Sequence, residues 1–457
     1  MRTEQAGITI MALQTLLLVT SVLLNVCPSF AVNKLLVVLV DGLREDYPAR
    51  DLHLLQFQAI AREGVKAQYV TPVFPAKSYP NYYSIMTGLY SESHGMTGNY
   101  MHDAERNVSF LVGFNQESFE PFWWENAEPL WITATKAGKA VNMYYWPGCQ
   151  VPIRNYVPNK CIELTDLPSF ENMLNSIDEI VQLFGDDVID MAGLYYQKVD
   201  IWGHRYGPES ELVRDKVLEV DTMLGYLRQK LTDTGLDQSV NVIILSDHGM
   251  ASLPDYSATS GYISLKDYVD VNDLKKPTLY SDMLVHIWPK DGLLEKVHSD
   301  LLNVPHSIVL KKEEIPEDWH YKRGKYVPPL LLVMQYPWLV FEDAAIPWTW
   351  DNATQFPRGS HGFSNSRMDM KGVFMAFGPD FRKGYEAGAI DIVDEYQLMC
   401  RLLDIIPLPN NGTWSRVEGM LLDGAISGTV SQHACVVSTF VIVQFMSIYF
   451  SVYCLLY

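Results

Sequence analysis

The sequence predicts an α/β fold in which a doubly wound, mostly parallel sheet carries helices on both faces. Nearly continuous apolar runs, typical of strands covered on both faces, occupy residues 34–40, 141–146, 191–196, 241–246 and 373–378. Residues 209–233 carry apolar side chains every three or four positions, which indicates a helix. Strands that alternate with helices favour a parallel sheet in one large domain. A small irregular insertion is expected at about residues 250–345.

Size and charge limit the classes of function. The 457 residues are 48% apolar and carry a formal net charge of −19. Such an acidic chain has no basic stripe that could neutralise phosphate backbones, so no nucleic-acid partner is expected. An acidic surface instead suits divalent metal ions or a cationic substrate group.

Both ends of the chain have the pattern of processing signals. An apolar run at 11–26 follows Arg2 and precedes small residues, which predicts a signal peptide over 1–29. The uncharged run 435–457 follows small residues at 427–429, and no basic residue comes after it. This order predicts a glycolipid anchor at Ser427 and removal of 428–457, rather than a spanning helix. The chain is therefore expected on the extracellular face of the plasma membrane, anchored in the outer leaflet. A form that is shed from the membrane is left open as well.

Cysteine and asparagine positions agree with an extracellular chain. Three of the six cysteines, Cys149, Cys161 and Cys400, lie between the two end segments. Cys149 and Cys161 flank a short loop that a disulfide could close, which leaves Cys400 either buried and free or linked to another chain. Candidate glycan acceptors in Asn-x-Ser/Thr sites are Asn107, Asn352 and Asn411.

Acidic and histidine side chains follow the ends of predicted strands. Asp41 comes directly after the first strand, and Asp247 and His248 come after the fourth. Because the carboxyl ends of parallel strands open onto one crevice, these three side chains should lie close together. Asp200 and His204 are four residues apart, a spacing that places both on one face of a helix.

Two further residues complete a hydrolytic pattern. Ser78 lies between Pro75 and Pro80, and His361 lies in a glycine-flanked loop. Carboxylates and imidazoles are the ligands that hydrolytic zinc prefers, and two zinc ions can hold both oxygens of a displacement at phosphorus. Each feature alone has an ordinary structural explanation, such as a turn or a solvated helix face. Their occurrence in one chain favours a two-zinc site with a serine nucleophile.

The motifs around these residues resemble the ectonucleotide pyrophosphatase/phosphodiesterase family of the alkaline-phosphatase-like superfamily. In chain order they are VDGLREDY, FPAKSYPNYYSIMTGLYSESHGMTGN, YYWPG, VDIWGHRYGP, NVIILSDHGM and SHGFSN. The resemblance implies an alkaline-phosphatase-like fold and a phosphodiesterase catalytic domain over 33–415. Within the family, SYPNYY, GNYM and PLPNNGTWSRV are most similar to the choline-specific glycerophosphodiesterase branch.

The resemblance also implies a role for each matching residue. One zinc would be held by Asp41, Ser78, Asp247 and His248, and a second by Asp200, His204 and His361. Ser78, where nucleotide-cleaving members have Thr, would be the nucleophile, and Asn99 would bond the phosphoryl oxygen. The substrate pocket would be lined by Tyr79, Trp146 and Tyr195, whose aromatic faces suit the quaternary ammonium of choline.

The function expected from the resemblance is zinc-dependent release of phosphocholine from glycerophosphocholine and lysophosphatidylcholine. Cleavage of nucleotide phosphodiesters or of sphingomyelin, and a non-catalytic ectodomain, are left open as alternatives. The choline-specific branch further implies a dimer joined by a cysteine near the carboxyl end. Because this chain has Gly419 at that place, a homodimer without that disulfide is the form left open.

Overall fold

The computed structural model describes residues 34–111, 116–254, 262–275, 283–341 and 357–423. The predicted signal peptide, the anchor site Ser427 with 428–457, and the candidate glycan site Asn352 lie outside these residues, so they stay predictions. No helix among the described residues is long and apolar enough to cross a membrane.

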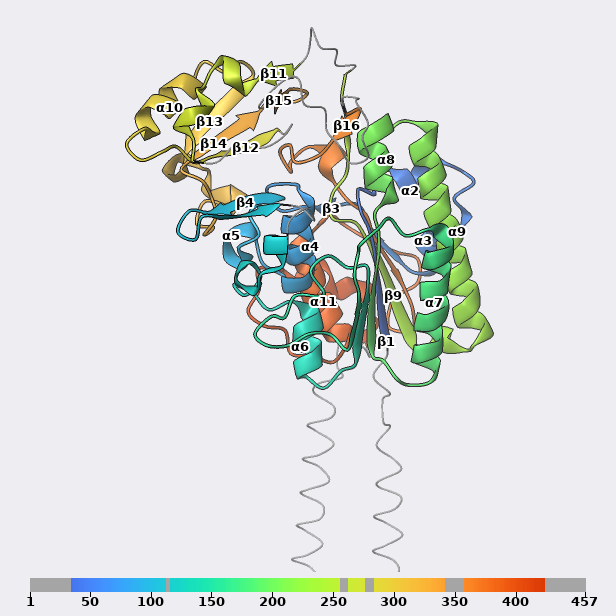
Figure 1. Cartoon of the computed structure of the whole chain (residues 1–457). Coiled ribbons are helices and arrows are strands. Elements are labelled where there is room, and N and C mark those ends of the chain that lie inside the picture. Colours follow the sequence, from blue (N-terminus) through green and yellow to red (C-terminus); the bar gives the residue numbers. More distant parts are fainter. Residues whose placement is uncertain (1–33, 112–115, 255–261, 276–282, 342–356, 424–457) are drawn as a thin grey trace, which may run out of the picture. The chain divides into compact units, whose positions relative to one another are not determined.

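An eight-stranded sheet lies at the centre of the described chain, in the order β18-β2-β17-β9-β1-β8-β6-β7 (Figure 1). Its strands are β1 (Lys34–Val40), β2 (Val65–Ala67), β6 (Val141–Tyr144), β7 (Lys160–Ile162), β8 (Met191–Tyr196), β9 (Val240–Leu245), β17 (Phe374–Phe377) and β18 (Tyr385–Ala387). Neighbouring strands run parallel except at β17, which is antiparallel to β9 and β2. The predicted α/β fold is therefore confirmed, with each predicted strand present.

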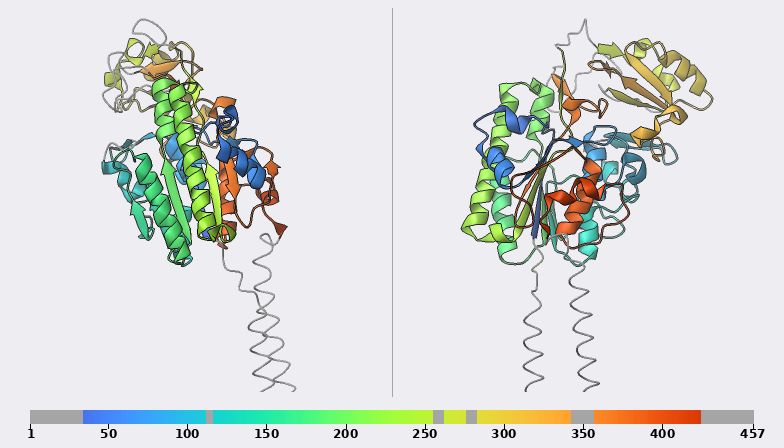
Figure 2. Two further views of the ribbon diagram at one scale, coloured as in Figure 1. Left: turned by 90° about the vertical axis from the view of Figure 1, so that its right-hand side faces the viewer. Right: turned by 180° about the vertical axis from the view of Figure 1, so that it is seen from behind.

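Helices cover both faces of this sheet (Figures 1 and 2). One face carries α7 (Phe170–Gly185) and α9 (Glu211–Asp233), and the other carries α4 (Ser78–Thr87), α6 (Leu130–Lys136) and α11 (Glu395–Leu402). Shorter helices are α2 (Tyr47–Arg50), α3 (Leu55–Glu63), α5 (Ser91–His94) and α8 (Lys198–Tyr206). The long α9 begins where the Ser210 side chain accepts a hydrogen bond from the Val213 amide, a common helix cap.

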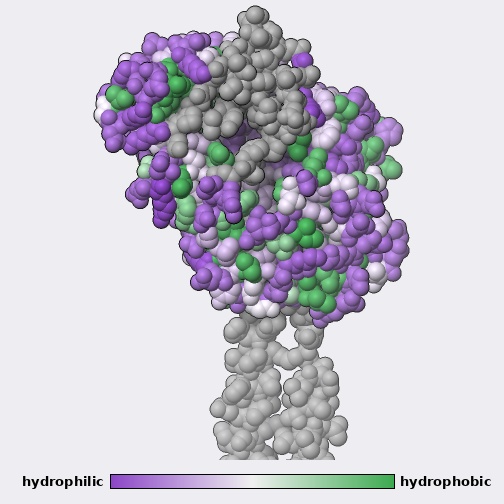
Figure 3. Space-filling view, viewed as in Figure 1, coloured by the Kyte–Doolittle hydropathy of each residue, from purple (hydrophilic) through white to green (hydrophobic). Residues whose placement is uncertain are grey.

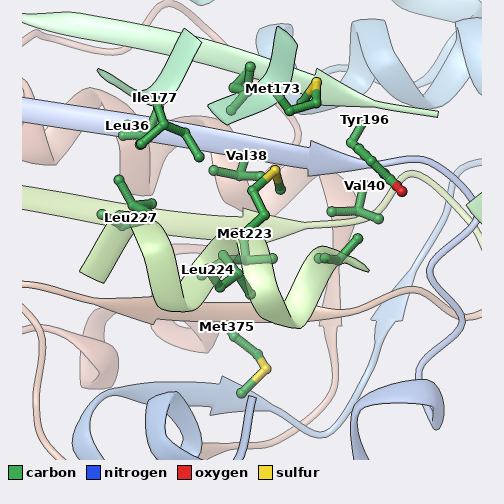
Figure 4. Close-up of a cluster of buried hydrophobic side chains, with 14 of the residues drawn as sticks. Leu36, Val38, Val40, Met173, Ile177, Tyr196, Met223, Leu224, Leu227 and Met375 are labelled. Atoms are coloured by element: carbon green, nitrogen blue, oxygen red, sulfur yellow. The ribbon is translucent and has the colours of Figure 1, made fainter. Parts of the chain in front are cut away.

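Strand β1 shows how the sheet is buried on both faces. Its residues 35–40 are all buried, and every second side chain points to the same face. One face packs against α7 and α9 through Leu36, Val38, Val40, Met173, Ile177, Met223, Leu224 and Leu227 (Figure 4). Burying each side chain of this kind stabilises the fold by about 2 kcal/mol. The core thereby fixes the position at which each central strand ends.

A small subdomain lies within residues 262–341, coloured yellow in Figure 1. Strands β12 (Leu284–Ile287), β14 (Leu330–Met334) and β13 (Ser307–Lys311) form an antiparallel sheet, accompanied by α10 (Leu294–Leu301). Strand β11 (Tyr262–Ser264) pairs with β15 (Leu339–Phe341) in parallel. The insertion was expected to be irregular, but its described parts are regular and share a buried core with Ala76, Ala251, Leu253, Phe363 and Met370. Strands of three to five residues are too short to give a clear sequence period.

Three two-stranded ladders complete the described strands. They pair β3 (Val70–Thr71) with β19 (Ile390–Asp391), β4 (Tyr100–Asp103) with β5 (Val108–Leu111), and β10 (Ala251–Ser252) with β16 (Gly359–Ser360). The β10–β16 pair leads directly into residue 361, and β4 begins directly after residue 99.

The cysteines and described glycan sites are placed as follows. A disulfide joins Cys149 and Cys161, whose Cα atoms are 5.7 Å apart, and Cys400 is buried in α11 without a disulfide. Asn107 and Asn411 are exposed, so both side chains are accessible to glycosylation. On the face in Figure 3 the described surface is mainly hydrophilic, with scattered apolar residues of the kind found on most proteins.

One buried carboxyl group has no hydrogen-bond partner for either of its oxygens. Glu395 at the start of α11 has no exposed surface, and neither of its side-chain oxygens has a hydrogen-bond partner. Burial, and next the neighbouring Asp394, raise the pKa of Glu395 well above its usual range. The folded chain therefore favours the protonated form up to a higher pH than the unfolded chain, which ionises this group above about pH 4.3.

This linkage predicts that Glu395→Gln stabilises the protein more at pH 8 than at pH 5. A raised pKa in the folded state means that stability falls as pH rises above the unfolded pKa, and the neutral amide removes that loss. Thermal unfolding should show a Tm gain of about 2 °C or more at pH 8 and a smaller gain at pH 5. The exposed Glu418→Gln is the matched control. Equal gains at both pH values would contradict a neutral Glu395.

Candidate functional site

The predicted crevice forms at the carboxyl ends of the three central strands. Asp41 directly follows β1, and Asp247 and His248 follow its parallel neighbour β9. Asp200 and His204 lie on α8, which begins two residues after β8 on the other side of β1. On that helix the Asp200 Oδ1 and His204 Nε2 atoms are 3.5 Å apart, as the spacing of four predicted.

Two more residues reach this crevice from outside the sheet. Ser78 is the first residue of α4, and its Oγ lies 3.2 Å from His248 Nε2. His361 directly follows β16, and its ring stacks on His248 with centroids 3.5 Å apart. The structure therefore brings the predicted nucleophile and the predicted ligands to one place.

The ligand atoms form two overlapping groups. Within each group the nitrogen and oxygen atoms all lie within 4.8 Å of one another: Asp200, His204 and His361 in one, and Asp41, Asp200 and His248 in the other. Asp247 lies beside the second group, with Oδ2 2.9 Å from His248 Nε2. The sequence analysis assigned four ligands to one zinc and three to the other. In the structure Asp200 stands between the two groups and contributes to both.

Each of the three histidines is oriented by a backbone carbonyl. His204, His248 and His361 place Nδ1 at 2.9, 2.9 and 2.8 Å from the carbonyl oxygens of Gly359, Gly249 and Ala76, respectively. A carbonyl only accepts, so Nδ1 carries the proton and donates it. Nε2 is then left with a lone pair that faces the carboxylates. This is the arrangement by which proteins orient metal-binding histidines.

The carboxylates of the site also have buried oxygens to which a cation could bind. One oxygen each of Asp41, Asp200 and Asp247 is buried without a hydrogen-bond partner. Burial first, and then neighbouring carboxylates, raise the pKa of Asp41 and Asp247 well above the usual range, and burial raises the pKa of Asp200 to about 6. Imidazole lone pairs and carboxylate oxygens that face one another repel, and a divalent cation in each group removes the repulsion. The residues present fit metal ions.

Two tyrosine hydroxyls hold Asp41 in place. Tyr82 and Tyr195 both donate to Asp41 Oδ2, and their hydroxyl oxygens lie 2.8 Å apart. Sequence reasoning missed Tyr82, although it follows Ser78 by four residues and so shares its face of α4. It placed Tyr195 in the substrate pocket, but the structure shows its hydroxyl on a carboxylate of the site.

The other predicted pocket residues lie in different surroundings. Asn99 places Nδ2 3.5 Å from Ser78 Oγ, and its Oδ1 accepts a hydrogen bond of 2.9 Å from the Tyr79 amide. The Tyr79 ring packs in an aromatic group with Tyr82, Phe110 and Trp124. Trp146 is only 1% exposed and packs against Gly193 of β8, where an added Cβ would lie 3.1 Å from its ring.

Arg44 joins the loops that carry the ligands. It lies three residues after Asp41, and its Nη1 donates to the Met250 carbonyl, 2.9 Å away in the loop of Asp247 and His248. Its Nη2 lies 2.6 Å from Glu209 Oε1, in the connection between α8 and α9. One guanidinium thus links the ends of β1, β9 and α8.

Fold and site fit a metal-dependent phosphodiesterase. The chain belongs to the type I phosphodiesterase/nucleotide pyrophosphatase family, whose model matches residues 35–364.

Curated relatives share about a third of their residues with this chain over most of its length. Human ectonucleotide pyrophosphatase/phosphodiesterase family member 5 is 34% identical over 391 residues, which are 85% of this chain and 78% of that protein. Mouse family member 7 is 32% identical over 410 residues, 88% of this chain and 90% of that protein. The bis(5'-adenosyl)-triphosphatase enpp4 of Xenopus laevis is 36% identical over 395 residues, 85% of this chain and 81% of that protein.

Solved structures agree with this assignment. Human family member 5 superposes with a TM-score of 0.78 at 34% identity, covering 85% of this chain and 99% of that one. An inactive threonine-to-alanine variant of murine family member 5, in complex with AMP, gives a TM-score of 0.76 at 34% identity, covering 85% and 100%. These relatives are family members 5 and 7 and enpp4, and none is named as the choline-specific glycerophosphodiesterase that the motifs resemble.

The hydroxyl contact predicts that Tyr195→Phe weakens every phosphodiesterase reaction of this chain alike. Loss of the hydrogen bond frees Asp41 Oδ2 on one side, and loss of such an outer partner typically costs 10- to 100-fold in metal affinity or activity. The measurement is kcat/KM on two unrelated phosphodiesters. Tyr196→Phe, on the opposite face of β8 in the core, should change neither (Figure 4). A loss confined to choline-containing substrates would instead place Tyr195 against the substrate.

Proposed function

We propose that this chain is a two-zinc hydrolase that cleaves nucleotide-type phosphodiester and pyrophosphate bonds with Ser78 as the nucleophile. The observation that carries the proposal is the position of Ser78 Oγ, 3.2 Å from His248 Nε2 and at the first residue of α4. Two related proteins support the nucleotide class: one is named a bis(5'-adenosyl)-triphosphatase, and another was solved with AMP.

The residues would act in the following way. Asp41, Asp247 and His248 with Ser78 would hold one zinc, and His204 and His361 the other, with Asp200 contributing to both. Bound zinc would favour the ionised serine hydroxyl and offset the negative charge of the phosphoryl group. The N-terminus of α4 adds a partial positive charge at the same point. The Asn99 amide, oriented by the Tyr79 backbone, would donate to the phosphoryl oxygen as charge develops there.

Choline phosphodiesters are the second candidate substrate class. Ser78 in place of Thr and the aromatic group around Tyr79 favour it, because aromatic faces attract a quaternary ammonium by about 1 to 2 kcal/mol. Lys77 argues against it. Burial lowers the pKa of His361 most, and the neighbouring His248 and His204 lower it further. The charge of Lys77 also lowers this pKa, so this lysine acts on the site. A cation beside the site favours substrates with additional negative charge over cationic ones.

Three chromogenic esters with the same leaving group separate the candidates. They are the p-nitrophenyl esters of thymidine 5'-monophosphate and of phosphocholine, and bis(p-nitrophenyl) phosphate. We expect kcat/KM to be at least about tenfold higher for the thymidine ester than for the phosphocholine ester, a difference of about 1.4 kcal/mol. The reverse order would replace the nucleotide proposal with the choline one. No hydrolysis of any ester by the zinc-loaded protein would mean a non-catalytic ectodomain.

Ser78→Ala should lower kcat by about a thousandfold or more while the fold and metal content stay unchanged. The variant loses the attacking oxygen but keeps the buried carboxylates and imidazoles. Steady-state kinetics with metal analysis checks this, with the exposed Ser366→Ala as the matched control. Near-normal turnover would mean that water, not Ser78, attacks phosphorus.

The purified wild-type chain should contain two zinc equivalents. His361→Ala should retain about one, because its group then keeps two ligands, whereas Asp200→Ala should retain less than one, because Asp200 belongs to both groups. Elemental analysis after gel filtration measures this, and His53→Ala, 79% exposed, is the control. One equivalent or none in the wild type would refute the dinuclear site. Equal loss in the two variants would refute a shared Asp200.

A further inference from the structure

A histidine–tyrosine pair of the small subdomain lies against the loop that carries Asn99. We propose that His286 and Tyr321 are positioning residues that hold the Asn99 side chain beside Ser78. His286 lies on β12, and Tyr321 lies between β13 and β14. This inference rests on the proposed hydrolytic function, in which Asn99 donates to the phosphoryl oxygen.

The pair holds the loop by its backbone carbonyls. The Tyr321 hydroxyl donates to the Thr97 carbonyl at 2.8 Å and lies 2.7 Å from His286 Nε2. His286 Nδ1 lies 3.1 Å from the Tyr100 carbonyl oxygen. Thr97 and Tyr100 are the residues on either side of Gly98 and Asn99. The subdomain thus fixes the backbone at both ends of this two-residue segment.

The contact is tight and largely dry. Tyr321 has no exposed surface, and His286 is 6% exposed. A Cβ added at Gly98 would lie 2.9 Å from His286 Cε1, closer than real Cβ atoms approach other atoms. The imidazole therefore rests directly on the backbone of Gly98. Hydrogen bonds in such a water-poor contact are costly to break, because each partner left unpaired loses its solvation.

The segment that carries Ser78 and Tyr79 holds the other side of the loop. The Asn99 side chain accepts from the Tyr79 amide and places its own amide nitrogen 3.5 Å from Ser78 Oγ. Tyr321 also meets Phe74 edge-on, with ring centroids 5.2 Å apart. Phe74 lies four residues before the nucleophile. The subdomain therefore braces both the segment that leads to Ser78 and the loop of Asn99.

This arrangement links the subdomain to the transition state rather than to substrate binding. A donor that meets charge developed only during reaction contributes to kcat and little to KM. If the Thr97–Tyr100 segment moves, the Asn99 amide no longer meets that charge, and displacements of about 1 Å at such donors lower rates up to about 100-fold. Weakening the pair should therefore reduce kcat selectively.

Tyr321→Phe tests this with the loss of one oxygen atom. With the thymidine ester and the full chain, we expect kcat to fall about tenfold, KM to change less than about twofold, and zinc content to stay unchanged. Tyr326→Phe is the matched control. Its hydroxyl also donates to a backbone carbonyl outside the subdomain, that of Phe122 at 3.3 Å, and its kcat should equal that of the wild type. An equal loss in both variants, or a rise in KM alone, would overturn the proposal.

A double-mutant cycle shows whether the effect passes through Asn99. In the Asn99→Ala background, Tyr321→Phe should lower kcat less than about twofold, because the group that it positions is already gone. A full tenfold loss in that background would overturn the proposal. Should Tyr321→Phe not fold, His286→Gln takes its place with the same expectations. If the wild type hydrolyses no ester, the proposed function fails. If the wild type is active and Tyr321→Phe equals it, only the positioning role fails.

Discussion

The mutual repulsion of three buried carboxylates is the constraint on which the rest of the site depends. Asp41, Asp200 and Asp247 each turn one oxygen into the crevice without a hydrogen-bond donor. The nearby histidines cannot supply one, because their Nδ1 protons are committed to backbone carbonyls. Protonation, which the raised pKa values favour, or cations between these groups can relieve the repulsion.

The fold keeps the ligands in place by attaching them to elements that cannot move independently. Two of the carboxylates follow adjacent central strands whose side chains are buried on both faces. Arg44 then links the loops after those strands to the end of α8. The two phenols on Asp41 come from α4 and β8, so the helix of Ser78 and the sheet share one carboxylate. Rigid elements hold such a constellation more accurately than loops.

The sequence predicts this site unevenly, for physical reasons. Apolar runs locate the strands, and strand ends locate Asp41, Asp247 and His248, because a parallel sheet gathers its carboxyl ends. The spacing of four residues between Asp200 and His204 is also enough to predict that both lie on one face of a helix. The shared position of Asp200 and the hydroxyls of Tyr82 and Tyr195 are not predictable in this way. They depend on how side chains of elements far apart in the chain point toward one another, and the local periodicity of a sequence does not predict this.

Metal ligands alone cannot decide the substrate. A site of carboxylates and imidazoles recognises phosphorus and its oxygens, which nucleotide and choline esters have in common. Selectivity must come from neighbouring groups, and this chain combines a lysine before Ser78 with an aromatic group after it. The small subdomain holds the loop of Asn99 through His286 and Tyr321, which under our proposal affects the rate of reaction rather than selectivity. A change in that insertion can therefore alter the rate of reaction without altering a single metal ligand.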